Sequence, residues 1–133
     1  MAIIASLLVS SVLTPMVDVS TYDLRGSFNL TNGLAAAGDN IQCFTIQRNG
    51  RLHGAHLKAL ASLGVGTTLQ LQRNRGGVRI NLTAATTAGA ASYVNSNAIG
   101  PVDVLAGDII EILVGGANIT AASAVEVDLL LQH

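Results

Sequence analysis

Very few residues of this sequence are of types that carry out chemistry, and their spacing argues against a catalytic or metal site. His53 and His56 are three positions apart in a segment whose pattern predicts a strand. Side chains at i and i+3 of a strand point to opposite faces, so this pair is not expected to share a metal ion. Cys43 is the only cysteine, and no catalytic signature surrounds it, so we expect a packed thiol. We therefore expect no enzyme activity, no cofactor and no metal.

The charged residues offer two further possibilities. Asp103 and Asp108 are five positions apart across an Ala-Gly-Asp turn, a spacing that allows a pair of catalytic carboxylates, but an aspartate after a glycine is adequately explained as a turn residue. Arg73, Arg75 and Arg79 gather in the glycine-rich segment QRNRGGVR, which lacks the Lys-Ser/Thr of a phosphate-binding loop. Three interpretations of these arginines stay open: a solvated hairpin tip, an anion contact, and salt bridges to an acidic partner surface. The last is the functional interpretation that we favour.

The composition narrows the class of protein. The chain has 133 residues, enough for one domain with its own core, and half of them are hydrophobic, which excludes global disorder. The net charge is −1 and only 3% of residues are aromatic, so we expect no nucleic-acid binding. Charged residues make up 11%, whereas an average globular domain has about 25%. We infer that part of the surface is covered by other protein.

The N-terminal segment is a separate feature. Residues 2–17 carry no charge, but the run is too short and too rich in serine and threonine for a transmembrane helix. No Lys or Arg precedes Arg25, whereas a signal peptide begins with basic residues. We expect an extended N-terminal arm over 1–20, followed by a single β-sandwich domain over 21–133, and no contact with a membrane.

One hairpin is predicted from the strongest short turn signal in the chain. Asn49-Gly50 separates two alternating segments, 41–48 and 51–60, and Asn-Gly favours the type I′ turn of a two-residue hairpin loop. This turn requires a positive φ at both central positions. The two segments are therefore expected to pair with each other.

A second hairpin is predicted from the binary pattern. Segments 67–73 and 78–84 flank a four-residue loop, and this register places Leu71 opposite Ile80 on a buried face. Polar residues then fall opposite polar residues on the outer face.

The remaining strands complete an all-β fold. Alternation or aliphatic runs predict strands over 19–24, 26–30, 91–95, 109–114 and 124–131. About eight antiparallel strands with some long connections suit a two-sheet sandwich of the jelly-roll type.

Two features point to interaction with protein. The arm is uncharged, and Ile109 and Leu113 lie on the strand face opposite the predicted core residues Ile110, Ile112 and Val114. Apolar groups left on a face that should be solvated usually mark an interface. The candidate interface residues are Ile3, Ile4, Leu7, Leu8, Val9, Ile109, Leu113, Arg73, Arg75 and Arg79.

Two segments also carry a resemblance to a known family. GVGTTLQLQRNRGGVRINLTAATTAGAA contains an Ala/Thr/Gly-rich connection, and GPVDVLAGDIIEILVGGAN contains an Ala-Gly-Asp turn that enters an aliphatic strand. In these features residues 54–131 resemble the head decoration (cement) proteins of tailed bacteriophages. Those proteins are single jelly rolls on the outer capsid surface.

The resemblance implies a structural role in the virion. It implies that the chain binds the outer surface of a phage capsid and stabilises contacts between major capsid subunits. The implied partners are the major capsid protein and further copies of the chain itself, as a homodimer or homotrimer. An alternative is a jelly-roll fibre-head or receptor-binding module of a phage. Neither role brings catalytic residues or a cofactor.

Overall fold

The computed structural model describes residues 3–4, 8–15, 21–87, 92–95 and 102–132, and these residues form twelve strands. The strands are β1 (Ile3–Ile4), β2 (Leu8–Pro15), β3 (Thr21–Leu30), β4 (Asn40–Thr45), β5 (Gly50–Ala59), β6 (Thr68–Arg75), β7 (Val78–Asn81), β8 (Thr86–Thr87), β9 (Ser92–Asn95), β10 (Val102–Val104), β11 (Ile109–Gly115) and β12 (Ser123–Gln132). In the part of the chain that is described, no helix is long and apolar enough to cross a membrane.

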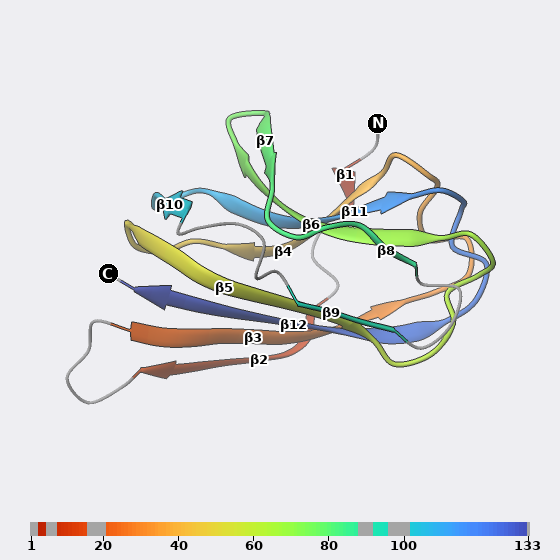
Figure 1. The fold of residues 1–133 in the computed structure, drawn as a ribbon, viewed down its shortest axis with the longest axis horizontal. Coiled ribbons are helices and arrows are strands. Elements are labelled where there is room, and N and C mark those ends of the chain that lie inside the picture. The colour runs from red at the N-terminus through yellow and green to blue at the C-terminus, as the bar shows by residue number, and fades with distance from the viewer. Residues whose placement is uncertain (1–2, 5–7, 16–20, 88–91, 96–101, 133) are drawn as a thin grey trace.

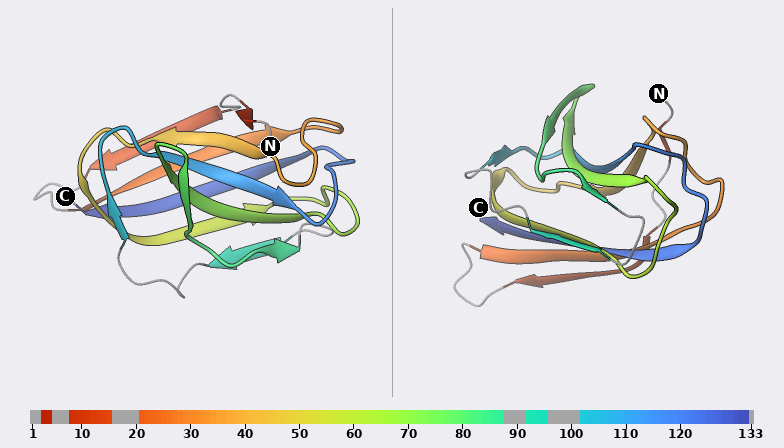
Figure 2. Two further views of the ribbon diagram at one scale, coloured as in Figure 1. Left: turned by 90° about the horizontal axis from the view of Figure 1, so that it is seen from above. Right: turned by 45° about the vertical axis from the view of Figure 1, so that its right-hand side comes forward.

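The strands form two sheets packed face to face (Figures 1 and 2). Sheet A has the order β1-β4-β11-β6-β7 with β8 beside β6, and sheet B has the order β10-β5-β12-β3-β2 with β9 beside β5. Four antiparallel pairs nest inside one another along the chain: β3 with β12, β4 with β11, β5 with β10, and β6 with β7. A ribbon of nested pairs folded over itself into two sheets is a jelly roll. The predicted all-β, two-sheet antiparallel sandwich is confirmed, with one parallel pair, β1 with β4.

The core fills the space between the sheets with aliphatic side chains at alternate positions. Phe28 of sheet B and Phe44 of sheet A meet edge to face, with ring centroids 5.5 Å apart. The inward positions predicted on β11 and β12 are confirmed as buried: Ile110, Ile112, Val114, Val125, Val127, Leu129 and Leu131. Alternation therefore identified most of the core, because its period of two matches the pleat.

The first predicted hairpin is wrong. β4 lies in sheet A beside β11, whereas β5 lies in sheet B beside β12, so the two segments do not pair with each other. Neither Asn49 nor Gly50 has a positive φ, which a type I′ turn would require. Instead, Asn49 Oδ1 accepts a hydrogen bond from Ala106 N at 2.9 Å, and Gly50 pairs with Val104. The chain crosses from one sheet to the other here, as consecutive strands of a jelly roll do.

The second hairpin is present, but its predicted register is wrong by two residues. The ladder joins Gln72 to Asn81 and Arg75 to Val78, so the loop contains only Gly76 and Gly77. Both glycines have positive φ, +58° and +91°, which is the type I′ requirement. A shift of two keeps every side chain on its predicted face, so the polar and apolar sides were assigned correctly.

The Gly76-Gly77 turn leads to a test of this register. No atom would lie within 4 Å of a Cβ added at Gly77, so Gly77→Ala introduces only the backbone strain of a positive φ. We expect a loss of about 1 kcal/mol in the free energy of unfolding. Chemical denaturation measures it, and an unchanged or higher stability would contradict the two-residue turn.

The N-terminal segment contributes a strand to each sheet. β1 pairs with Asn40 and Ile41 of β4 at one edge of sheet A, and β2 pairs with β3 from Phe28 to Tyr22 at one edge of sheet B. The segments predicted as strands over 19–24 and 26–30 form, in their described residues, one continuous strand, β3 (Thr21–Leu30), and residues 19–20 lie outside the described part of the chain. In the described residues, the predicted arm thus lies along edges of its own sandwich.

Candidate interaction surfaces

The Ala-Gly-Asp turn between β10 and β11 holds a buried carboxylate. Gly107 has a φ of +95° and lets the chain reverse, and Asp108 N donates to Leu105 O at 2.9 Å. Asp108 Oδ2 accepts a hydrogen bond from Leu105 N at 2.9 Å, and Ile46 N donates to the Asp108 carbonyl oxygen at 2.8 Å. Asp108 is only 2% exposed. A buried carboxylate in such a position requires a cation nearby.

The β6–β7 hairpin supplies that cation. Arg75 donates two hydrogen bonds to Asp108, from Nε at 2.9 Å and from the terminal nitrogen Nη2 at 2.8 Å, and Arg73 Nε lies 4.0 Å from the same carboxylate. The hydrogen bonds from Arg75 lower the pKa of Asp108, against the opposing effect of its burial. The same hydrogen bonds to Asp108 raise the pKa of Arg75. The two-pronged contact fixes the hairpin to the β10–β11 turn.

A second buried carboxylate lies on the outer face of sheet A. Glu111, in the central strand β11, has no exposed surface. Arg79 Nε donates to Glu111 Oε1 at 2.8 Å, and Asn74 Nδ2 donates to Glu111 Oε2 at 3.4 Å. Figures 1 and 2 show the β6–β7 hairpin bending away from the sandwich on this side of the sheet, where β7 carries Arg79. The hairpin thus helps to enclose Glu111.

A row of amides continues this polar layer across sheet A. Asn40 Nδ2 donates to Gln72 Oε1 at 3.0 Å, and Gln72 Nε2 donates to Asn81 Oδ1 at 2.9 Å. Ile109 and Leu113 flank Glu111 on the same face and are half-buried. The outer face of sheet A is therefore a hydrogen-bonded polar layer with two partly exposed aliphatic side chains.

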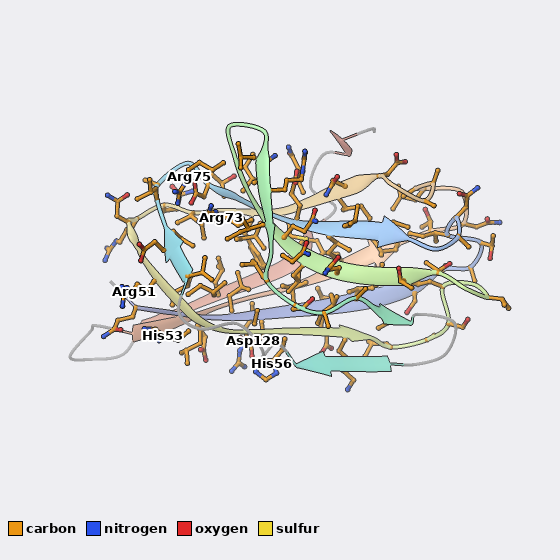
Figure 3. The ribbon with its side chains drawn as sticks, turned by 45° about the horizontal axis from the view of Figure 1, so that its top comes forward. Arg51, His53, His56, Arg73, Arg75 and Asp128 are labelled. Carbon is orange, nitrogen blue, oxygen red and sulfur yellow. The ribbon has the colours of Figure 1, made fainter. Side chains whose placement is uncertain are left out.

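The candidate arginines are paired within the chain. Arg75 meets Asp108 and Arg79 meets Glu111, while Arg73 lies close to Asp108 and donates to the Asp103 carbonyl at 2.8 Å. The carboxylates that the sequence led us to expect on a partner surface are thus supplied by this chain itself, as the side chains of Asp108 and Glu111. Figure 3 shows Arg73 and Arg75 side by side near the β10–β11 end of sheet A.

The two aspartates near this turn do not form a carboxylate pair. Asp108 is held by Arg75, and Asp103 Oδ1 accepts from Arg51 Nε at 3.1 Å on the exposed surface. The predicted hairpin at Asn49-Gly50 would have placed Arg48 opposite Arg51, and this like-charge pairing across a hairpin does not form because β4 and β5 are in different sheets.

His53 and His56 both lie on the outer face of sheet B. The prediction that they point to opposite faces of the strand is therefore wrong. β12 pairs Leu130 with Gly54 but Leu131 with Leu52, so a bulge inserts His53 as an extra residue. The bulge changes the alternation, so His53 is exposed and His56 half-buried on one face (Figure 3). His53 hydrogen-bonds to Gln132, and His56 pairs with Asp128 in the ladder. Among the described residues, no group of three or more His, Cys, Asp or Glu side chains could hold a metal ion.

Cys43 is packed in the core, as predicted. Its side chain is buried, its Sγ donates to Ile41 O at 3.6 Å, and burial raises the pKa of the thiol far above its usual range. A thiol that stays protonated is neither a nucleophile nor a metal ligand.

The N-terminal candidate residues are divided between the sheets. Ile3 and Ile4 form β1 in sheet A, whereas Leu8 and Val9 begin β2 in sheet B. Leu7 lies outside the described residues. The structure thus places these candidates at two sheet edges and Ile109 and Leu113 on the outer face of sheet A.

The buried partners of the arginines were missed from the sequence. Glu111 lies between Ile109 and Leu113 on the face predicted to be outward, and Asp108 lies in the predicted turn, but an outward-facing strand position or a turn normally implies exposure. The signal available in the sequence was opposite charge. One segment carries Arg73, Arg75 and Arg79, and the segment around the Ala-Gly-Asp turn carries the acidic residues. Only the pairing of β6 with β11 brings them together.

Comparisons with known proteins agree with this architecture. No protein-family model matches the chain, and no curated protein matches it. A solved structure described as the capsid of Ralstonia phage GP4 contains a chain of similar fold, with a TM-score of 0.67 and 22% sequence identity. The similarity covers 99% of this chain and 98% of that chain, so it includes both sheets and their connections. The chain thus has, over nearly its full length, the fold of a chain found in a phage capsid.

Proposed function

We propose that this chain is a structural protein of a phage virion that binds the outer surface of the capsid and stabilises contacts between major capsid subunits. The observation that carries the proposal is the full-length similarity to a chain of the Ralstonia phage GP4 capsid. Because nearly all of both chains is covered, that chain is likewise a small β-sandwich and not a part of a much larger subunit. A protein of this size suits an accessory role in a shell.

The state of the reactive groups supports a structural role. The thiol of Cys43 is buried and protonated, and the carboxylates of Asp108 and Glu111 are engaged with Arg75 and Arg79. The two ion pairs join segments that are distant in sequence and tie the β6–β7 hairpin to β11 and the turn before it. Such links favour a surface that is organised before binding, which lowers the entropy cost of association.

The sheet edges offer a way to attach. β1 and β2 lie at the edges of sheets A and B, and an edge strand carries backbone groups that can pair with another chain. We propose that the apolar N-terminal strands, including Ile3, Ile4, Leu8 and Val9, and the half-buried Ile109 and Leu113 contribute to contacts with the capsid or with further copies of the chain. Residues 1–20 then act as an attachment segment of the domain formed by 21–133.

Addition of the purified chain to capsids assembled without it tests the proposal. We expect saturable binding, a fixed number of copies per capsid and a higher temperature of capsid disruption, because binding to the intact shell stabilises it by mass action. Centrifugation and thermal scans of the bound particles measure both effects. Recovery of the protein only with tail fibres, and none with capsids, would favour the fibre-head alternative.

A further inference from the structure

Positive charge is concentrated at one end of the sandwich. We define the basic end as residues 46–51, 73–78 and 102–108, which lie around the β10–β11 turn, and Figure 3 labels three of its arginines. The basic end holds four arginines and two aspartates: Arg48, Arg51, Arg73, Arg75, Asp103 and Asp108. Its formal net charge is therefore +2, whereas the whole chain has a net charge of −1, so the remaining residues together carry −3.

The three segments of the basic end are joined into one surface by printed side-chain and backbone contacts. Asn49 Oδ1 accepts a hydrogen bond from Ala106 N at 2.9 Å, and Arg51 lies opposite Asp103 in the ladder of β5 and β10. Arg73 Nη1 donates to the Asp103 carbonyl oxygen at 2.8 Å, which attaches the β6–β7 hairpin to β10. The surface is thus organised before any partner binds, which lowers the entropy cost of association.

The two carboxylates of the basic end do not neutralise its guanidinium groups. Arg75 donates two hydrogen bonds to Asp108, whereas Arg73 Nε lies 4.0 Å from the same carboxylate. That Nε atom is buried and has no hydrogen-bond partner among the described residues. Asp103 pairs with Arg51, whose side chain is 61% exposed, and this contact uses one of the five N–H donors of the guanidinium. The internal pairs therefore leave an excess of two positive charges.

Aliphatic side chains are exposed at the same end. Leu105 in the β10–β11 turn is 41% exposed, and Val78 at the hairpin is 65% exposed. All the basic residues of this end are arginines, and the single lysine of the chain, Lys58, lies outside it. Protein interfaces are enriched in arginine and depleted in lysine, because a guanidinium is less strongly hydrated than an ammonium and binds a carboxylate through two parallel hydrogen bonds.

We infer that the basic end is an interaction surface for an acidic surface of a partner protein. Carboxylates of the partner would lie opposite Arg48 and Arg51, and its apolar groups would contact Leu105 and Val78. A charge of +2 is small for a nucleic-acid site, which neutralises several phosphates, and exposed aliphatic groups gain nothing from phosphates. A protein surface supplies both carboxylates and apolar contacts. The inference deepens the proposed function, on which it rests for the identity of the partner, a major capsid subunit.

Two double variants with the same change in total charge test the position of this surface. Arg48→Glu with Arg51→Glu changes the net charge of the basic end from +2 to −2. Arg25→Glu with Lys58→Glu makes an equal change on the outer face of sheet B. All four side chains are exposed, so neither double variant should disturb the fold. Thermal unfolding of each variant checks this before binding is measured.

Co-sedimentation with capsids assembled without this chain measures binding over a series of salt concentrations. We expect the variant with Arg48→Glu and Arg51→Glu to raise the dissociation constant by about tenfold or more at low salt, and the effect to shrink as salt screens the charges. The variant with Arg25→Glu and Lys58→Glu should bind like the unmodified chain. If the unmodified chain binds capsids and the two double variants bind them equally well, the inference is overturned, although the proposed function stands.

A second matched pair tests the apolar part of the contact. Leu105 and Leu130 are 41% and 42% exposed, and Leu130 lies on the outer face of sheet B. We expect Leu105→Ser to weaken binding to capsids and Leu130→Ser to leave it unchanged. Equal effects of the two serines would leave charge as the only contribution of the basic end and contradict the proposed contact with Leu105.

A labelled oligo-glutamate peptide decides the inference if the unmodified chain does not bind capsids. Fluorescence anisotropy at low ionic strength should show binding that is lost with Arg48→Glu and Arg51→Glu but kept with Arg25→Glu and Lys58→Glu. In that case the inference stands and the proposed function fails. No binding of the peptide, or equal binding by both double variants, would overturn the inference. Tighter binding of duplex DNA than of the peptide, abolished by the same two substitutions, would assign the basic end to nucleic acid and overturn it as well.

Discussion

Asp108→Asn is expected to lower the free energy of unfolding by about 3 kcal/mol at neutral pH. The substitution keeps the size of the side chain but removes the charge that Arg75 and Arg73 face. Asparagine cannot replace the two charge-assisted hydrogen bonds that Asp108 accepts from Arg75, and Arg73, whose side chain is only 11% exposed, loses the negative charge beside it. Chemical denaturation of the two proteins measures the difference, and the near-native shape of asparagine ensures that the effect reports on charge.

The pH dependence of this difference gives a second readout. Because the pKa of Asp108 is lowered in the folded chain, its ion pair stabilises the fold fully above the unfolded pKa of about 3.9. That stability is lost as the pH falls from there through the folded pKa, so the difference between the native protein and Asp108→Asn should shrink in acid. Asp103→Asn is the matched control, since the Asp103 side chain is 70% exposed and its pair with Arg51 should contribute less than about 1 kcal/mol. If Asp108→Asn and Asp103→Asn lower the free energy of unfolding equally, the buried ion pair of Asp108 is not what fixes the hairpin to the β10–β11 turn.

Gly116→Ala is expected to destabilise the chain by about 3 kcal/mol. Gly116 has a φ of +70°, and a Cβ at this position would overlap the carbonyl oxygen of Gly66 in the neighbouring loop. Both the backbone strain and the overlap with another backbone group oppose the substitution. The close approach also joins the β11–β12 loop to the β5–β6 loop, so the change should loosen the contact between these loops together with the fold.

Gly77→Ala separates the effect of backbone strain from the effect of steric overlap. Gly77 also has a positive φ, but an added Cβ there meets no atom within 4 Å, so its loss should be about 1 kcal/mol. Urea denaturation of both variants tests the comparison. If Gly116→Ala is no more harmful than Gly77→Ala, the loops are not packed as closely as the structure shows.

The sequence predicted the fold class because local alternation survives in the finished jelly roll. The face of each side chain on β11 and β12 depends only on the pleat, and so does the polar side of the β6–β7 hairpin. The partner of a strand depends on long-range topology. Asn49-Gly50 is a strong local hairpin signal, yet it lies where the chain crosses between sheets, because β11 and β12 occupy the positions beside β4 and β5. The preference of Asn-Gly for a tight turn does not reveal that β11 and β12 compete for pairing with β4 and β5.

The candidate interaction surfaces were predicted less completely than the fold. The three arginines were identified from their spacing, but their partners Asp108 and Glu111 are 32 or more positions away and meet them only through the β6–β11 ladder. The low charge of the chain was visible in its composition. The composition could not show that Asp108 and Glu111, two of the eight acidic residues, are buried.

Electron cryomicroscopy of the particles produced from the genome that encodes this chain tests the proposed function most directly. If the proposed function is right, a jelly-roll density lies on the outer face of the capsid, in contact with more than one major capsid subunit and present at a regular set of positions. A capsid whose density is fully explained without this chain, or a jelly roll found only at a fibre tip, would contradict it.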